Sequence, residues 1–251
     1  MKQVRKMMGM TITVEILDSP SPETDLEKVF SYFDYVDKKF SPYKETSEIS
    51  KINRGELQER DWSEDMKTVF TLSTETNQKT NGYFDITAPN GKIDPSGLVK
   101  GWAIYNAAQI LQKIGRENFY IDAGGDIQSR GKNSRGEDWS VGIKNPFHPE
   151  EIVKVIYIKN NEGVATSGSY LRGQHIYNPK NKTKPITEVV SLTVIGPNIY
   201  EADRFATAAF AMEQNGINFI ENLDGFEGYQ IDKNGQATMT SGFKKYTSIN
   251  V

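Results

Sequence analysis

Apolar positions along this chain recur at helical spacing in some stretches and alternate with polar ones in others. Between residues 23 and 40 they lie three or four positions apart, which predicts a helix with one buried face. From Met10 to Leu17 they alternate with polar residues, which predicts a half-buried strand. The helical stripe consists of Leu26, Val29, Phe30, Phe33, Val36 and Phe40.

Further helices are predicted where capping and stop signals frame apolar periodicity. Ser63 is a good N-cap for a helix that ends before Asn81-Gly82, and Gly115 closes a helix over 98–114. An alanine-rich helix covers 201–212, and a shorter one covers 217–223. Further strands are predicted over 119–123, 139–143, 152–158, 189–195, 227–231 and 237–241.

The remaining stretches are interpreted as irregular or weakly structured. Residues 40–53 are polar and rich in turn formers, and Gly124-Gly125-Asp126 is interpreted as a tight turn. Residues 164–170 are small and polar, and 174–182 are interpreted as a strand followed by a turn. Strands and helices are interspersed without a strict βαβ period. We therefore expect an α+β fold, with helices packed on mixed or antiparallel sheets, in one domain spanning residues 1–251.

Composition narrows the classes of function. The chain has 251 residues, no cysteine, two histidines and a formal net charge of −3. Disulfides, thiolate metal sites, cysteine nucleophiles and histidine-rich metal sites are excluded, and no electrostatic case exists for nucleic acid or an anionic membrane. For the sequence as given, neither a signal peptide nor a lipidation cysteine is expected ahead of the first strand, and no stretch is long and apolar enough to suggest a membrane span. A cytoplasmic location is expected, or an extracytoplasmic one for a trimmed mature form.

The helix over 201–212 carries candidate chemistry. Asp203 and Thr207 are four residues apart, so their oxygens lie on one side of the first two turns. One carboxylate and one hydroxyl so placed suit a hard cation such as Mg²⁺, which prefers oxygen ligands. The alternative is structural: Asp203 caps the helix and Thr207 bonds back to a carbonyl.

A second candidate stretch runs from Gly82 to Gly101. Asp85 and Asp94 lie among Gly, Pro and Asn, where side chains can meet a ligand. Lys100 is expected in the first turn of a helix, beside peptide N–H groups that favour anions, which suits a phosphate. Turn-forming Gly and Pro with a solvated lysine are the structural alternative.

The two histidines differ in their surroundings. His175 lies near a small, glycine-bearing segment and is a candidate general base at neutral pH, with a structural or surface histidine as the alternative. His148 lies in Asn-Pro-Phe-His-Pro-Glu and is interpreted as a surface residue.

These features belong to a set of nine motifs that occur in one order along the chain. The motifs are Met8-Gly9-Met10, Phe40-Ser-x-Tyr43-x-x-x-Ser47-Glu48-Ile-Ser-x-Ile-Asn53, Gly82-x-Phe-Asp85-Ile-Thr87, Asp94-x-x-Gly97-x-x-Lys100-Gly101, Gly124-Gly-Asp126-Ile, Trp139-x-Val-Gly-Ile, Ala165-Thr-Ser-Gly168-x-Tyr170, His175-Ile176-x-x-Pro179 and Ala202-Asp203-x-x-Ala-Thr207-Ala.

In these motifs the chain closely resembles the ApbE family, the FAD:protein FMN transferases, from Met8 to its final strands. The resemblance implies transfer of FMN from FAD to a threonine or serine hydroxyl of an acceptor flavoprotein, with release of AMP. It implies Mg²⁺ bound by the Gly97 carbonyl, Asp203 and Thr207, with a second carbonyl from Ala206, and His175 as the general base. The FAD contacts that it implies are Met8, Tyr43, Tyr83, Phe84, Asp85, Asp94, Lys100 and Ile176.

The chain departs from the family pattern in places. Met8-Gly9-Met10 replaces the usual Met-Gly-Thr, and the stretch between Thr87 and Asp94 is shorter than in many relatives. The short stretch is expected to remodel the flavin-side rim. Two other activities therefore stay open at this point: hydrolysis of FAD to FMN and AMP at the same metal site, and FAD binding without turnover.

Overall fold

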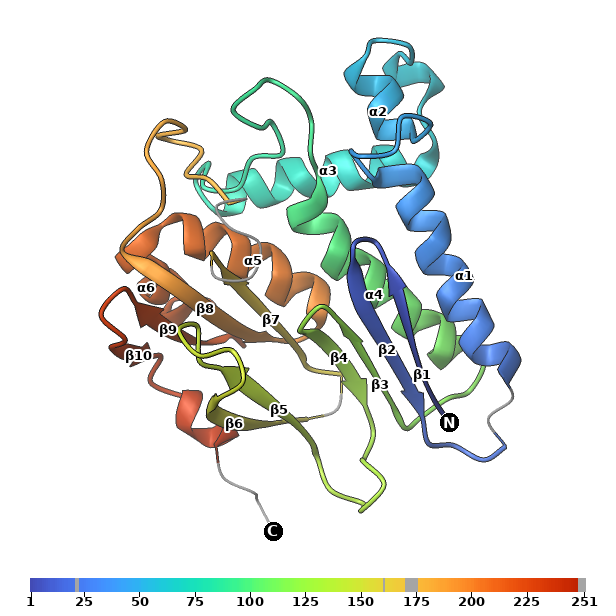
Figure 1. Ribbon diagram of the computed structural model, residues 1–251, viewed down its shortest axis with the longest axis vertical. Coiled ribbons are helices and arrows are strands. Elements are labelled where there is room, and N and C mark those ends of the chain that lie inside the picture. Colours follow the sequence, from blue (N-terminus) through green and yellow to red (C-terminus); the bar gives the residue numbers. More distant parts are fainter. Residues whose placement is uncertain (21–22, 160, 170–175, 248–251) are drawn as a thin grey trace.

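An antiparallel sheet of eight strands organises the chain in the computed structural model, which describes residues 1–20, 23–159, 161–169 and 176–247 (Figure 1). Its strand order is β1-β2-β3-β4-β7-β8-β9-β10, and β5 and β6 pair separately as a hairpin. The strands are β1 (Lys2–Met7), β2 (Met10–Ile16), β3 (Phe119–Ala123), β4 (Asp126–Arg130), β5 (Trp139–Lys144), β6 (Ile152–Ile158), β7 (Gly163–Gly168), β8 (Val189–Gly196), β9 (Glu227–Asp232) and β10 (Ala237–Met239).

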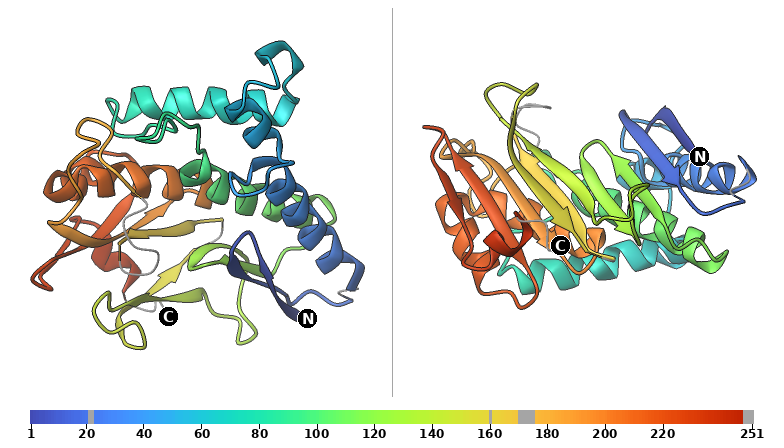
Figure 2. Two further views of the ribbon diagram at one scale, coloured as in Figure 1. Left: turned by 45° about the horizontal axis from the view of Figure 1, so that its top comes forward. Right: turned by 90° about the horizontal axis from the view of Figure 1, so that it is seen from below.

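The helices gather on one side of this sheet, and the β5–β6 hairpin packs against the other (Figure 2). No helix in the described ranges is long and apolar enough to cross a membrane. The helices are α1 (Glu23–Phe40), α2 (Glu48–Asn53), α3 (Glu64–Lys79), α4 (Ser96–Lys113), α5 (Ile199–Ala211) and α6 (Gly216–Glu221), with short 3₁₀ turns at Glu59–Asp61, Glu213–Asn215 and Phe243–Tyr246.

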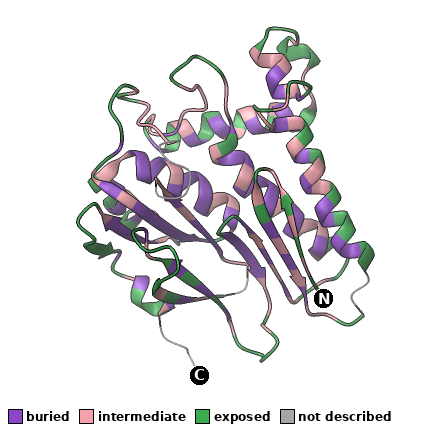
Figure 3. Ribbon diagram, in the orientation of Figure 1, coloured by how far each residue is buried: buried purple, intermediate pink, exposed green. Residues whose placement is uncertain are grey.

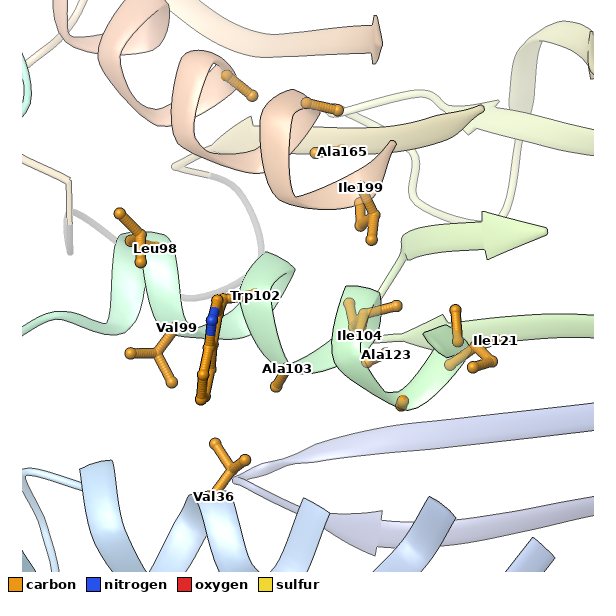
Figure 4. Packing of buried hydrophobic residues seen from close by; sticks show 14 of the residues in the cluster. Val36, Leu98, Val99, Trp102, Ala103, Ile104, Ile121, Ala123, Ala165 and Ile199 are labelled. Atoms are coloured by element: carbon orange, nitrogen blue, oxygen red, sulfur yellow. The ribbon is translucent and has the colours of Figure 1, made fainter. Parts of the chain in front are cut away.

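Helix α4 is the centre of the main core and lies between α1 and α5 (Figure 4). Val99 and Trp102 point toward Val36 of α1, and the Trp102 ring meets Phe40 edge-on at 5.6 Å between centroids. Burial is densest on α4, α5 and the central strands (Figure 3). Each such large apolar side chain contributes about 1.5–3 kcal/mol on burial, so the position of α4 is firmly fixed.

A second, smaller core lies between the sheet and the β5–β6 hairpin. Trp139 of β5 stacks on Tyr120 of β3 with ring centroids 5.2 Å apart. Ile127 of β4 faces this core. Because side chains alternate along a strand, its neighbours Asp126 and Gln128 face the helices instead. The Gln128 side chain accepts a hydrogen bond from the backbone N–H of Ile199 (2.8 Å) and so attaches the start of α5 to the sheet.

The predicted α+β class is confirmed, and the strongest periodic stretches are correctly placed. The helix over 23–40 has the predicted ends, and Leu26, Val29 and Phe33 of its stripe are fully buried. Ser63 caps α3 by accepting a hydrogen bond from the backbone N–H of Met66. The Asp232–Gly235 turn joins β9 to β10 as expected.

Several weaker interpretations are wrong. The polar stretch 40–53 contains α2, which Ser47 caps, and 163–168 form strand β7. Strands β1 and β4 were not predicted. Of the stretch interpreted as a strand and a turn, 176–178 have no regular structure, whereas the following turn is present.

Candidate active site

Helices α4 and α5 approach most closely at Gly101. A Cβ atom at this position would lie 2.6 Å from the Cβ of Asp203 and 2.9 Å from the carbonyl oxygen of Ile199, so only glycine fits. The backbone N–H of Gly101 donates to Oδ2 of Asp203 at 2.7 Å. This close crossing places the Asp203 carboxylate, 2% exposed, at the second turn of α4.

One turn along, the Thr207 hydroxyl donates to the carbonyl oxygen of Gly97 at 3.3 Å. In an α-helix the N–H of residue 101 ordinarily donates to the carbonyl of residue 97. Here both of those backbone groups have side-chain partners on α5. The predicted spacing thus brings together Gly97, Asp203 and Thr207.

The structural alternative for Asp203 is wrong, because Asn198 is the N-cap of α5 and accepts a hydrogen bond from the backbone N–H of Glu201 at 3.0 Å.

Asp126 and Lys100 complete this group. The Lys100 ammonium lies 2.5 Å from Oδ2 of Asp126 and 3.5 Å from Oδ1 of Asp203. The other oxygen of Asp126 accepts a hydrogen bond from the backbone N–H of Thr166 at 3.1 Å. Since α4 begins at Ser96, Lys100 lies in its second turn rather than the first. Asp126 belongs to one of the motifs quoted above, but no local pattern of residues indicates its role.

The surroundings of Asp203 change the protonation of its carboxyl group. Burial raises the pKa of Asp203 to about 7; the Lys100 ammonium opposes this rise, and the neighbouring Asp126 carboxylate adds to it. A buried carboxylate that is costly to ionise is a group that a cation would stabilise strongly.

The oxygen set fits Mg²⁺. Asp203, the Thr207 hydroxyl and the Gly97 carbonyl are the hard donors that this ion prefers. In the described part of the chain, no cluster of three or more His, Cys, Asp or Glu side chains could hold a metal; this set differs because two of its donors are neutral oxygens. Ala206 is fully buried within α5, and its carbonyl stays a prediction as a ligand.

A second group joins the loop after α3 to the segment 176–185. The Lys182 ammonium donates to Oδ2 of Asp85 at 3.0 Å and to the carbonyl of Thr87 at 2.7 Å. The Tyr177 hydroxyl donates to the carbonyl of Asp85 at 2.7 Å. Burial alone would raise the pKa of Asp85, but the Thr87 N–H and the Lys182 ammonium outweigh it and lower that pKa below its usual value.

Beside this group lies a cavity of about 390 Å³. Its walls include the predicted FAD contacts Asp94 and Ile176 together with Lys182 and Lys184. A cavity with two lysines and an apolar wall is suited to a ligand that carries both phosphate and a ring. Neither lysine was singled out from the sequence, because nothing in their local pattern indicates what they face.

The other predicted residues lie on several different elements. The Phe84 ring is buried, and its edge lies 3.6 Å from where a Cβ atom of residue 97 would be. The Lys180 ammonium lies over the Tyr83 ring, 4.3 Å from the ring centroid. Met8 is half-buried at the β1–β2 turn, and Tyr43 is 91% exposed. Their FAD contacts stay predictions.

Of the two histidines, the structure describes only His148. His175 lies outside the described residues. His148 is exposed, as expected for a surface loop.

Gly101→Ala is expected to destabilise the protein by about 1–3 kcal/mol, because the added methyl group overlaps Asp203 and the Ile199 carbonyl. Urea unfolding measures the loss, and Ser96→Ala, at an exposed position of the same helix, is the control expected to stay near wild type. Wild-type stability of Gly101→Ala would contradict the close approach of α4 and α5.

If FAD is the substrate, as the resemblance implies, Lys182→Met is expected to raise its KM about three- to tenfold with little change in kcat, because Asp85 and Thr87 lose a partly exposed ammonium. Steady-state kinetics checks this, with Lys233→Met at the β9–β10 turn as control. An unchanged KM would separate the Asp85 loop from FAD binding.

Comparison with known proteins places this chain in a family. The pattern that defines the ApbE family matches residues 8–90 and 88–229. A curated relative, the FAD:protein FMN transferase of Escherichia coli K12, is 29% identical over 69% of this chain, and the chain spans about half (52%) of that protein's length. The FAD:protein FMN transferase of Klebsiella pneumoniae is 26% identical over 97% of this chain and 86% of its own.

Solved structures show the same fold. The flavin transferase ApbE from Vibrio cholerae superposes with a TM-score of 0.85 at 23% identity, covering 98% of both chains. The ApbE protein from Thermotoga maritima gives 0.88 at 22% identity, covering 99% of both chains. The α+β fold is thus that of the ApbE structures, and the chain belongs to the ApbE family.

Proposed function

We propose that this protein is a Mg²⁺-dependent FAD:protein FMN transferase that moves FMN from FAD to a threonine or serine hydroxyl and releases AMP. The observation that carries the proposal is the oxygen set of Gly97, Asp203 and Thr207. The segment 84–97 connects this set to the cavity lined by Asp94 and Ile176. Family membership and the names of the relatives support the same activity.

In this proposal Mg²⁺ is held by Asp203, Thr207 and the Gly97 carbonyl, with Ala206 as a further carbonyl donor. When bound, the ion supplies charge neutralisation at the pyrophosphate and at the departing AMP. The rigid α4–α5 crossing keeps the protein oxygens in place, so little reorganisation is needed during the reaction.

The chain's own residues orient FAD. Lys100 faces phosphate, while Asp85 and Asp94 accept hydrogen bonds from the cofactor. Tyr43 is exposed and free of the core, which suits stacking on a ring of the cofactor. Met8, Tyr83, Phe84 and Ile176 form the remaining contacts in the proposal.

The chemical step is attack of the acceptor hydroxyl oxygen on the phosphorus of the FMN half of FAD. A new P–O bond forms to the acceptor, the bond to the bridging pyrophosphate oxygen breaks, and AMP leaves with that oxygen. His175 accepts the proton of the hydroxyl as general base. Positioning and charge account for most of the catalysis in such transfers.

Hydrolysis of FAD is the second candidate, because water can take the place of the hydroxyl at the same site. The short segment between Thr87 and Asp94, closed by the Thr87–Ile93 bridge, borders the cavity. A change in this border alters which acceptor can enter, and this is the reason to keep hydrolysis as a candidate. FAD storage without turnover is the third candidate, and it predicts no AMP at all.

Incubation with FAD and Mg²⁺, with and without a domain that bears a candidate threonine, separates the three. We expect AMP together with in-gel fluorescence of the acceptor. Equal AMP without an acceptor means hydrolysis, and tight FAD binding without AMP means storage. Either of these results would overturn the transferase proposal.

A further inference from the structure

Asp126 contacts the candidate metal site without being one of its proposed ligands. It is 1% exposed at the start of β4 and faces the helices. The Thr166 N–H holds one of its oxygens, and the Lys100 ammonium lies 2.5 Å from the other. Three separate elements, β4, β7 and α4, therefore meet at this carboxylate.

Lys100 is shared unequally between two carboxylates. Its ammonium is 1.0 Å farther from Asp203 (3.5 Å) than from Asp126 (2.5 Å). Coulomb attraction falls with distance, so Asp126 exerts the stronger pull on the ammonium. Without the Asp126 charge, the same ammonium would move toward Oδ1 of Asp203, since Oδ2 is already occupied by the Gly101 N–H.

We propose that Asp126 is a positioning residue that draws the Lys100 ammonium away from Asp203, so that Asp203 stays available to a divalent cation and Lys100 to phosphate. An ammonium paired with Asp203 would compete directly with the cation for the same carboxylate oxygen. The inference rests on the proposed metal site and not on the acceptor or on FMN transfer.

The test is a titration with Mn²⁺ in the absence of FAD. Electron paramagnetic resonance measures the concentration of the free ion. Asp126→Asn keeps the shape of the side chain and removes its charge; we expect the affinity for Mn²⁺ to fall about tenfold or more. Lys100→Met/Asp126→Asn, which has the same local net charge as the wild type, is expected to recover an affinity within about threefold of wild type. Circular dichroism and melting temperature establish that each variant is folded.

The outcomes distinguish the possible roles of Asp126. If the double variant stays as weak as Asp126→Asn, Asp126 is itself a ligand and the inference is wrong. Unchanged affinity in Asp126→Asn also overturns it. Should Asp126→Asn not fold, the double variant alone decides: affinity near wild type supports positioning, and a tenfold loss contradicts it. A wild type that binds no Mn²⁺ overturns the metal site itself, whereas FMN transfer is measured separately.

Discussion

Replacement of Asp203 by alanine is expected to abolish AMP release from FAD, with a loss of at least about 10²-fold in kcat. Asp203 supplies the charged ligand of the proposed oxygen set, and Thr207 and the Gly97 carbonyl are neutral. Without it the site keeps the Lys100 ammonium but loses the carboxylate that attracts a cation. Chromatographic measurement of AMP at saturating FAD and Mg²⁺ checks the prediction.

The controls for Asp203 separate metal binding from folding. Because burial raises the pKa of Asp203, the carboxylate is not expected to be a source of stability, and the variant should fold. Asp232→Asn, in the β9–β10 turn at the edge of the sheet, also removes one carboxylate charge and should keep wild-type activity (Figure 1). Full activity of a folded Asp203→Ala would refute the metal assignment.

His175→Ala is expected to reduce FMN transfer about 10²–10⁴-fold while leaving FAD binding intact. The reason is chemical: a neutral imidazole is the natural acceptor for the hydroxyl proton near pH 7. The next residue, Ile176, lines the cavity proposed for FAD. Single-turnover flavinylation measures the step, and fluorescence titration measures FAD affinity.

His148→Ala is the matched control, since His148 is exposed and is expected to have no effect on either measurement. If His175→Ala retained full transfer rates, another group would have to accept the proton. If it lost FAD binding instead, His175 would be a binding residue rather than the base.

The fold was predictable where one face of a helix or strand is buried and the other is exposed to solvent. Helices α1 and α3 have that pattern, and so does strand β2. Strand β4 has buried side chains on both faces, and β7 is built from small residues. Neither strand therefore shows an alternation of apolar and polar residues. Helix α2 has only six residues, and most of its surroundings are polar, so the turn formers around it obscured the helix.

The site was predictable only in part, for a related reason. The four-residue spacing of Asp203 and Thr207 fixes a shared helix face, which is local information. The partners Asp126 and Lys182 lie 77 and 97 positions from Asp203 and Asp85, respectively. Their contacts depend on how strands and loops pack, which no local pattern of residues encodes.

The most direct test of the account is the intact mass of an acceptor domain after incubation with this protein, FAD and Mg²⁺. We expect a mass gain of one FMN moiety per acceptor, matched by an equal amount of AMP, and no gain when the acceptor threonine or serine is replaced by alanine. AMP release with no change in the mass of the acceptor would contradict FMN transfer.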